Sequence, residues 1–484
     1  MSEHVLVAGS GIAGLGAALA LGGTRRVTLV DRDSAAPGGD AEDAFAHWER
    51  RGATQLRHSH VFLGRLTTLI QERYPDLLKD LTEAGARVFT FEDGLPPPLR
   101  DGYSASPGDE DLSILFSRRT TLELVMRRYV LRQHNVTFLN DAGVRGLSID
   151  GTRVLGLKVE RDGTTQDMLA DVIVDATGRN TSFPDWLREA GFSISEEERP
   201  AGILYFTRHY KLKDGAEEPV RDGTPGAGDL GYIKFGVFPA DNRHFSITLA
   251  VPEIETELRM AVMKPEVFDA ICDAIPGCAR WIDRDRAGPA SQVFAMGNLK
   301  STWRRFDPRL EGFFAIGDAA VRTNPLYGRG CSAGIVHAHI LREVLDSVQN
   351  PLARAAKFEI DTRKALRPFY DSMVRQDKQA IRRAANERDP HYKPSFRARA
   401  IKSLVEDAIG PATRGDIGTL RAFSRAFHMI DDPNEWWKKP GTVARLLGFW
   451  ATPERIKRER GFYPPKFGPE RAEMLERLQL RSSR

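Results

Sequence analysis

The sequence is poor in the features that mark several common protein classes. Its 484 residues include three cysteines, Cys272, Cys278 and Cys331, and their spacing is not that of metal ligands. Free thiols in a reducing cytoplasm are the simplest account, so we expect a cytoplasmic protein without a bound metal. No apolar run is long enough for a transmembrane helix. Zinc, P-loop and RNA-binding signatures, internal repeats and low-complexity segments are all absent from the sequence.

An excess of charge of one sign is also lacking. Seventy Lys and Arg residues stand against 66 Asp and Glu residues, which gives a net charge of +4, and the two signs are mixed along the chain. Such mixing is typical of a solvated surface, and we expect no nucleic-acid partner. Because 41% of the residues are hydrophobic, a chain of this length can form two or three domains with a large core.

The most informative stretch lies near the N-terminus. A short apolar run over 5–7 predicts a buried strand, a small-residue segment over 13–21 predicts a helix, and 27–30 predicts a second strand. A signal peptide or membrane segment is the alternative interpretation. No basic region precedes the apolar run, and the run is too short to span a membrane.

Three glycines between the first strand and the helix have G-x-G-x-x-G spacing. Gly9 permits a tight turn, Gly11 lets a pyrophosphate approach the backbone, and Gly14 lets helix and strand pack closely. The helix N-terminus offers free N–H groups to phosphates, and Asp31 stands where a carboxylate accepts hydrogen bonds from a ribose. The predicted dinucleotide contacts are Gly9, Gly11, Ile12, Ala13, Gly14, Asp31 and Arg32.

Two histidines follow a polar segment, 33–51, that is predicted as a loop. His58 and His60 would share one face of a strand, as metal ligands do, but no acidic or sulfur partner is near them in sequence. The other interpretations are a cofactor-facing loop that leads into the helix predicted over 61–74, or simple helix capping. Further on, Arg119 opens a helix predicted to end near Leu131, where it either reaches a phosphate or cofactor edge or lies on the surface.

The pattern changes twice in the second half of the chain. Alternation over 203–212, 232–239 and 244–251 predicts antiparallel strands, with an exposed loop over 213–229. A second G-x-G-x-x-G match over 226–231 is rejected, since no strand precedes it and a strand follows it. About half of the candidate aromatic wall residues are expected to face a pocket, and these candidates are Tyr205, Phe206, Phe235, Phe238 and Phe245.

After residue 310 the pattern returns to a strand, over 313–316, followed by glycines that lead into a helix. The chain beyond residue 339 is helical in character and combines basic residues with tryptophans such as Trp436 and Trp450. That combination is typical either of a membrane surface or of aromatics that pack the helices onto the main body.

Four motifs in order resemble one family: GSGIAG, QLRHSH, DVIVDATGRNTSFPDWL and GDAAVRTNPLYGRGCSAG, over roughly 4–340. The chain resembles FAD-dependent monooxygenases of the para-hydroxybenzoate hydroxylase fold, most of all bacterial polyether-type flavin epoxidases and squalene-epoxidase-like proteins. The resemblance implies an α/β fold with a Rossmann-like FAD-binding domain, an inserted antiparallel substrate domain and a helical C-terminal region. The implied boundaries are 1–195 (with substrate-side segments near 75–117), 196–300, 301–345 and 346–484.

The same resemblance implies the remaining site residues. Asp318 would bind the ribityl chain, Arg119 the cofactor, and the N-P-x-x-G-x-G loop would lie against the isoalloxazine ring. Flavin-proximal candidates are Arg57, His58 and Pro325, and no catalytic acid or base can be chosen. The further cofactor contacts implied are Arg57, Arg119, Val144, Gly317, Asp318, Pro325, Gly328 and Gly330.

The implied reaction uses FAD and O2. A flavin C4a-(hydro)peroxide would insert one oxygen atom into a hydrophobic small-molecule substrate, by epoxidation or hydroxylation. Electrons would come from NAD(P)H, either directly or through a flavin reductase. The W-x-W-x-I-P motif of tryptophan halogenases is absent from the sequence. Two alternatives stay open: an FAD-dependent reductase of the geranylgeranyl-reductase kind, and a non-catalytic flavin-binding protein with peripheral membrane contact.

Overall fold

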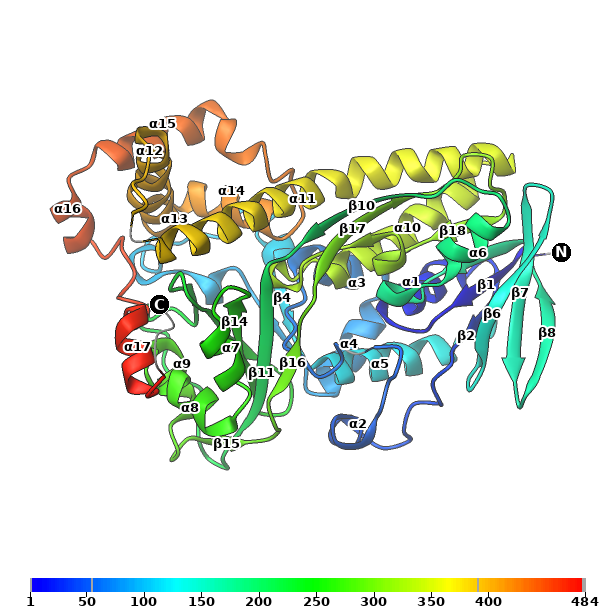
Figure 1. Ribbon diagram of the computed structural model, residues 1–484, viewed down its shortest axis with the longest axis horizontal. Coiled ribbons are helices and arrows are strands. Elements are labelled where there is room, and N and C mark those ends of the chain that lie inside the picture. The colour runs from blue at the N-terminus through cyan, green and yellow to red at the C-terminus, as the bar shows by residue number, and fades with distance from the viewer. Residues whose placement is uncertain (1, 54, 390, 481–484) are drawn as a thin grey trace.

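The computed structural model describes residues 2–53, 55–389 and 391–480 (Figure 1). Its first layer is a five-stranded, all-parallel sheet in the order β18-β9-β1-β2-β5. The strands are short apolar runs with helices on their faces, which is the usual setting of a parallel sheet. They are β1 (His4–Ala8), β2 (Arg26–Val30), β5 (Val136–Leu139), β9 (Val172–Asp175) and β18 (Phe313–Ala315).

Three helices cover this sheet and form its core. Helix α1 (Ile12–Leu21) consists of small and apolar residues and packs against α10 (Gly330–Ser347), although more than 300 residues separate them in sequence. Helix α5 (Arg119–Leu131) packs beside α1 and against α4 (Pro75–Glu83). The other α-helices of the first 190 residues are α2 (Ala41–His47), α3 (Gly64–Arg73) and α6 (Phe183–Glu189).

The second layer is an antiparallel sheet in the order β12-β13-β14-β11-β15, with β16 also paired to β11. One face of this sheet packs into a core with the helices that follow it, and the other face turns toward the parallel-sheet domain. The elements are β11 (Ile203–Leu212), β12 (Ala227–Asp229), β13 (Lys234–Pro239), β14 (His244–Pro252), β15 (Ala287–Pro289), β16 (Phe294–Met296), α7 (Thr256–Ala261), α8 (Pro265–Asp273) and α9 (Pro276–Ile282).

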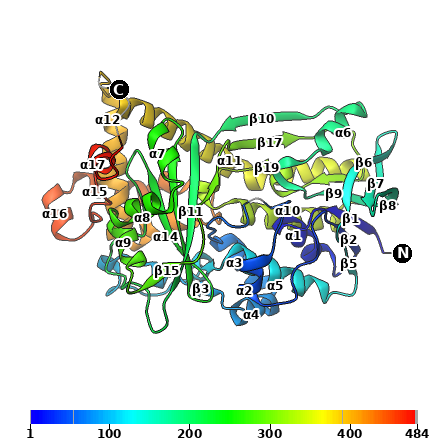
Figure 2. The same ribbon diagram turned by 60° about the horizontal axis from the view of Figure 1, so that its bottom comes forward.

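Smaller sheets connect or flank the two layers. Strands β10 and β17 run along one side of the molecule between them (Figure 2). The elements of these sheets are β3 (Arg87–Phe89), β4 (Ile114–Phe116), β6 (Gly143–Asp150), β7 (Arg153–Arg161), β8 (Thr164–Leu169), β10 (Ser195–Pro200), β17 (Lys300–Arg305) and β19 (Val321–Arg322).

The C-terminal part is helical. Helix α11 (Pro351–Arg388) spans 38 residues, about 57 Å at the usual rise per residue, and leads from the parallel-sheet side to a cluster of short helices (Figure 1). The last helix returns to the antiparallel sheet, where Arg471 pairs with the buried Glu255. The remaining helices are α12 (Phe396–Ser403), the π-helical η7 (Leu404–Ile409), α13 (Gly410–Gly415), α14 (Ile417–Phe427), the 3-10 helix η8 (Trp436–Lys438), α15 (Pro440–Ala451), α16 (Glu454–Glu459) and α17 (Arg471–Arg477).

The predicted α/β class, with an inserted antiparallel sheet and C-terminal helices, is confirmed. The prediction that 33–51 is a loop throughout was wrong, because it contains α2, whose Asp40 and Asp43 form a capping box. The predicted loop 213–229 ends in β12, which pairs with β13. The rejected glycine match over 226–231 therefore lies in an antiparallel hairpin, as the absence of a following helix indicated.

Candidate functional site

A single large cavity, of about 1210 Å³, runs from the glycine turn after β1 to the antiparallel sheet. Its volume exceeds the usual range of drug-sized pockets and suits a dinucleotide together with a second ligand. All of the predicted cofactor contacts except Gly14 and Arg57 line it. The lining contacts are Gly9, Gly11, Ile12, Ala13, Asp31, Arg32, Arg119, Val144, Gly317, Asp318, Pro325, Gly328 and Gly330.

The glycine turn fits a pyrophosphate. Gly9 has φ +95°, and a Cβ there would lie 2.6 Å from the Ala176 carbonyl oxygen. A Cβ at Gly14 would lie 1.9 Å from the Gly9 carbonyl oxygen, so Gly14 serves close packing behind the turn rather than the cavity surface. A Cβ at Gly11 would meet nothing within 4 Å, and Gly11 is the N-cap of α1 without a side-chain cap. The turn therefore presents free N–H groups to the cavity.

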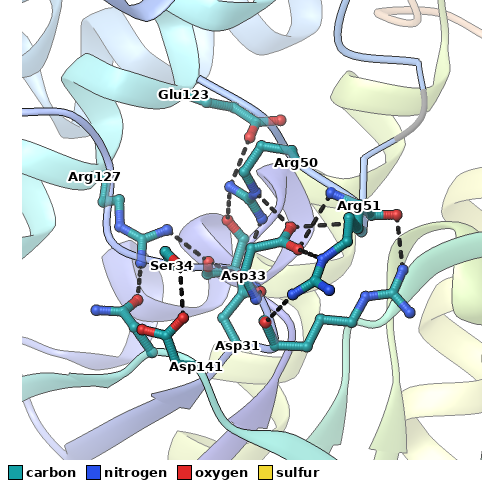
Figure 3. Close-up of polar contacts among 12 residues, drawn as sticks. Asp31, Asp33, Ser34, Arg50, Arg51, Glu123, Arg127 and Asp141 are labelled. Carbon is teal, nitrogen blue, oxygen red and sulfur yellow. Dashed lines mark hydrogen bonds and ion pairs between the residues drawn. The ribbon is translucent and has the colours of Figure 1, made fainter. Parts of the chain in front are cut away.

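Beside this turn, Arg50 holds three buried carboxylates together (Figure 3). It donates to Asp31 Oδ2 at 2.9 Å, to Asp33 Oδ2 at 2.9 Å and to Glu123 Oε2 at 3.1 Å, and all four side chains are at most 4% exposed. Burial lowers the pKa of Arg50, but Glu123, Asp31 and Asp33 raise it above its ordinary value. The cluster fixes the end of β2 against α5 and the segment before His58.

Asp31, the predicted ribose acceptor, is already engaged by protein donors. Its Oδ2 accepts from the Ser10 backbone N–H at 3.0 Å, from the Ser10 hydroxyl and from Arg50. Its Oδ1 accepts only the Asp33 N–H, at 2.9 Å, among the described residues. One oxygen of Asp31 thus keeps a lone pair for a ligand hydroxyl.

Arg119 lies in the cavity wall at the start of α5. It pairs with Glu123 at 2.5 Å, and its Nη1 lies 3.3 Å from His60 Nε2 and 3.3 Å from the Cys331 sulfur. Burial lowers the pKa of Arg119, but Glu123 and Cys331 more than offset this effect. Burial and the neighbouring Arg119 lower the pKa of His60 to about 3, so that ring is neutral.

Asp318 follows β18 and faces the cavity without a hydrogen bond to its carboxylate from any described residue. Burial raises the pKa of Asp318, and the nearby arginines, led by Arg179 and Arg322, oppose that rise. An acceptor carboxylate in this position suits the hydroxyls of a ribityl chain. The loop beyond it turns at Gly328, whose φ is +65° and whose Cβ would lie 2.8 Å from Val61 Cγ1.

The side chains of Arg57 and His58 lie in different surroundings. The Arg57 guanidinium lies over the Phe45 ring, 5.1 Å from its centroid, and Arg57 is not part of the cavity lining. Its predicted cofactor contact therefore has no support from this side-chain position. His58 does line the cavity, and its Nδ1 lies 3.1 Å from Thr207 Oγ1. Burial, then Arg179, lowers the pKa of His58 to about 4.

The far end of the cavity is rich in apolar side chains and is shared by the antiparallel sheet and the C-terminal helices. Alternation along the strands places Tyr205 and Phe238 on the cavity face, whereas Phe206 and Phe245 belong to the core behind the sheet. Phe235 pairs with Leu249 and packs in that same core, although part of it also borders the cavity. The C-terminal contribution was not predicted, since it depends on packing between distant segments. Its lining residues are Ser372, Gln376, Phe423, Ala426, Phe427, Pro433 and Trp436.

Helix α11 also holds the loop after β19. Asp377 Oδ1 accepts from Asn324 Nδ2 at 2.8 Å and from the Tyr327 hydroxyl at 3.0 Å. Asn324 Oδ1 in turn accepts from the Tyr205 hydroxyl at 2.5 Å. Burial raises the pKa of Asp377 to about 6, and no described residue bonds its Oδ2. Pro325, predicted to lie near the flavin, therefore begins a loop that is fixed from two sides.

The described part of the chain contains no group of three or more His, Cys, Asp or Glu residues placed to hold a metal ion. Within the same residues, no helix combines the length and apolar character needed to cross a membrane.

A family match agrees with this geometry, in which one cavity joins the glycine turn to carboxylates at both ends of the cofactor region. Residues 4–181 match the family described as FAD dependent oxidoreductase. The chain is an FAD-dependent oxidoreductase. A curated relative, Protein Rv3254 of Mycobacterium tuberculosis, is 28% identical over 501 residues, covering 94% of this chain and 96% of that protein.

Solved structures show the fold of this oxidoreductase to be like that of para-hydroxybenzoate hydroxylase. A flavoprotein/dehydrogenase from Cytophaga hutchinsonii superposes with a TM-score of 0.60 at 14% identity, covering 95% of this chain and 99% of that one. The myxobacterial chondrochloren halogenase CndH gives 0.57 at 17%, covering 86% and 91%. PqsL from Pseudomonas aeruginosa, described as a probable FAD-dependent monooxygenase, gives 0.55 at 16%, covering 79% and 98%.

Proposed function

We propose that this oxidoreductase is a monooxygenase, an epoxidase or hydroxylase, that inserts one atom of dioxygen into a hydrophobic small molecule. The observation that carries the proposal is the continuity of the cavity, which joins the dinucleotide turn to an apolar chamber roofed by a sheet and closed by helices. Oxygen transfer needs such a chamber, because water diverts activated oxygen from the substrate. PqsL, of the same fold, is described as a probable monooxygenase.

The residues divide the binding of FAD among them. Gly11 and the N-terminus of α1 would hold the pyrophosphate, Asp31 the adenosine ribose, and Asp318 the ribityl hydroxyls. The loop from Pro325 to Gly330 would lie against the ring system, with Arg119 beside it. Bound FAD would supply the activation of dioxygen, and this chain would orient the substrate and exclude water. NAD(P)H would supply electrons, directly or through a separate reductase.

A reductase or dehydrogenase is the second candidate. It is favoured by the likeness to the Cytophaga hutchinsonii flavoprotein/dehydrogenase, which extends over 95% of this chain. Such an enzyme would use the same cavity to transfer hydrogen between FAD and an apolar substrate, without inserting oxygen.

Isotopically labelled dioxygen separates the two candidates. The FAD-loaded protein, with any ligand that co-purifies identified by mass spectrometry, is reduced without oxygen and then mixed with labelled dioxygen and that ligand or 2-naphthol. A monooxygenase gives a product with one labelled oxygen atom. Reduction or desaturation of the ligand, with all of the label in hydrogen peroxide or water, would instead support the second candidate.

A further inference from the structure

A chain of side-chain hydroxyls runs along the cavity wall behind His58. Thr207 on β11 and Thr248 on β14 lie directly opposite each other in the antiparallel ladder, with their Oγ1 atoms 2.7 Å apart. Thr248 Oγ1 donates to Ser59 Oγ at 2.7 Å, and Ser59 Oγ donates to Ser246 Oγ at 2.7 Å. At the other end, His58 Nδ1 lies 3.1 Å from Thr207 Oγ1.

This arrangement determines which His58 nitrogen carries the proton. A hydroxyl has one proton to donate. Thr248 gives its proton to Ser59, so Thr207 must supply the proton between the two threonines. Thr207 then offers only lone pairs to His58, and the proton in that contact must belong to His58 Nδ1. The ring is neutral at physiological pH, because its pKa is lowered to about 4, and Nε2 is therefore an acceptor.

The acceptor at Nε2 has no partner within the described protein. His58 is 8% exposed and lines the cavity, and no described donor bonds Nε2. The neighbouring hydroxyl protons of the wall are already committed, those of Thr207 and Thr248 to the chain and that of Tyr205 to Asn324. Nε2 is thus an unsatisfied acceptor of this wall, in a chamber whose lining also includes the apolar side chains of Phe238, Met296, Phe423 and Trp436.

We propose that His58 Nε2 selects substrates that carry a hydroxyl or N–H donor on an otherwise apolar body, against hydrocarbons of the same shape. The statement that this ligand is a substrate rests on the proposed function. A hydrocarbon would remove water from Nε2 without replacing its hydrogen bond, and a site built to accept such a bond discriminates strongly against analogues that lack the donor. Thr207 is the positioning residue, since it fixes the ring and its tautomer.

The test compares a matched pair of ligands on the FAD-loaded protein. Calorimetric titration with 2-naphthol and with its methyl ether, 2-methoxynaphthalene, should show about tenfold tighter binding of the naphthol. Thr207→Val, which leaves His58 in place, should remove most of that preference, and Thr207→Ser should keep it. His58→Phe should abolish it. Equal affinities in the unaltered protein, no binding of naphthol, or a preference that survives Thr207→Val and His58→Phe would each overturn the proposal.

A second measurement does not depend on the choice of ligand. Nitrogen NMR of the histidine-labelled holoprotein, with His58→Phe to assign the signal, should show a neutral ring protonated at Nδ1. A cationic ring or the opposite tautomer at neutral pH would refute the assignment. Because neither measurement needs turnover, a protein that holds FAD and prefers naphthol but never transfers oxygen would refute the monooxygenase proposal alone.

Discussion

At the residue scale, two glycines of one turn have different structural roles. Gly9 adopts φ +95° with its Cβ direction blocked by the Ala176 carbonyl, whereas Gly11 faces open space. We predict that Gly9→Ala lowers the free energy of unfolding by about 1–3 kcal/mol. Gly11→Ala should change it by less than about 0.5 kcal/mol but weaken FAD binding, because its methyl group enters the cavity. Denaturant unfolding of the FAD-free proteins and titration with FAD check both; equal stability of the two variants would contradict the prediction.

Arg50 offers a second prediction at this scale. Its removal leaves Asp31, Asp33 and Glu123 buried without the cation that they share. Arg50→Met should therefore lower the free energy of unfolding by about 3–5 kcal/mol. Arg51→Met is the matched control, since Arg51 is 79% exposed and lies 3.8 Å from Asp33, and it should cost less than about 1 kcal/mol. Urea unfolding measures both variants. Similar losses of unfolding free energy for the two would show that Arg50 does not stabilise the fold through its carboxylate cluster.

At the element scale, short-range sequence patterns were enough to predict the strands and the helix around the cofactor turn. Residues 5–30 show their strand, turn and helix in consecutive residues, and the structure has all three there. Helix α2 was missed because its short, polar sequence has no long apolar period, although Asp40 and Asp43 carried the capping signal. The role of α14 in the cavity had no local signal, because it depends on which distant surface covers Phe423 and Phe427.

Helix α11 gives a prediction about pH. The pKa of Asp377 is raised by burial to about 6, above its ordinary value of 3.8. Between about pH 4 and pH 6 the folded protein therefore keeps a proton that the unfolded chain has lost, and this group's contribution to stability falls as pH rises through that window. Asp377→Asn keeps an acceptor for Asn324 and Tyr327 but does not titrate.

Relative to the unaltered protein, Asp377→Asn should thus gain about 2 kcal/mol of unfolding free energy between about pH 4 and pH 7. Urea unfolding of both proteins across this range measures the difference, and titrations shared by the two proteins cancel. Parallel pH profiles would mean that Asp377 ionises freely in the folded state.

At the scale of the whole molecule, three parts distant in sequence enclose one cavity: the parallel-sheet domain, the antiparallel sheet and the C-terminal helices. Trp436 is buried where the C-terminal helices close the cavity, and it packs edge-on against Phe423, with ring centroids 5.6 Å apart. Trp450 lies in the same helical region but is 42% exposed and outside the cavity lining. Substituting each tryptophan in turn therefore distinguishes loss of cavity closure from the general effect of losing an aromatic side chain.

We predict that Trp436→Ala lets water and small solutes reach the cofactor chamber, whereas Trp450→Ala does not. Iodide quenching of flavin fluorescence in the FAD-loaded proteins measures this access. The quenching constant should rise severalfold for Trp436→Ala, since truncating a buried aromatic leaves a space that its surroundings fill only in part. It should stay unchanged for Trp450→Ala. An equal rise for both variants, at equal FAD content, would mean that the C-terminal helices protect the flavin loosely as a group and not through the side chains that line the cavity.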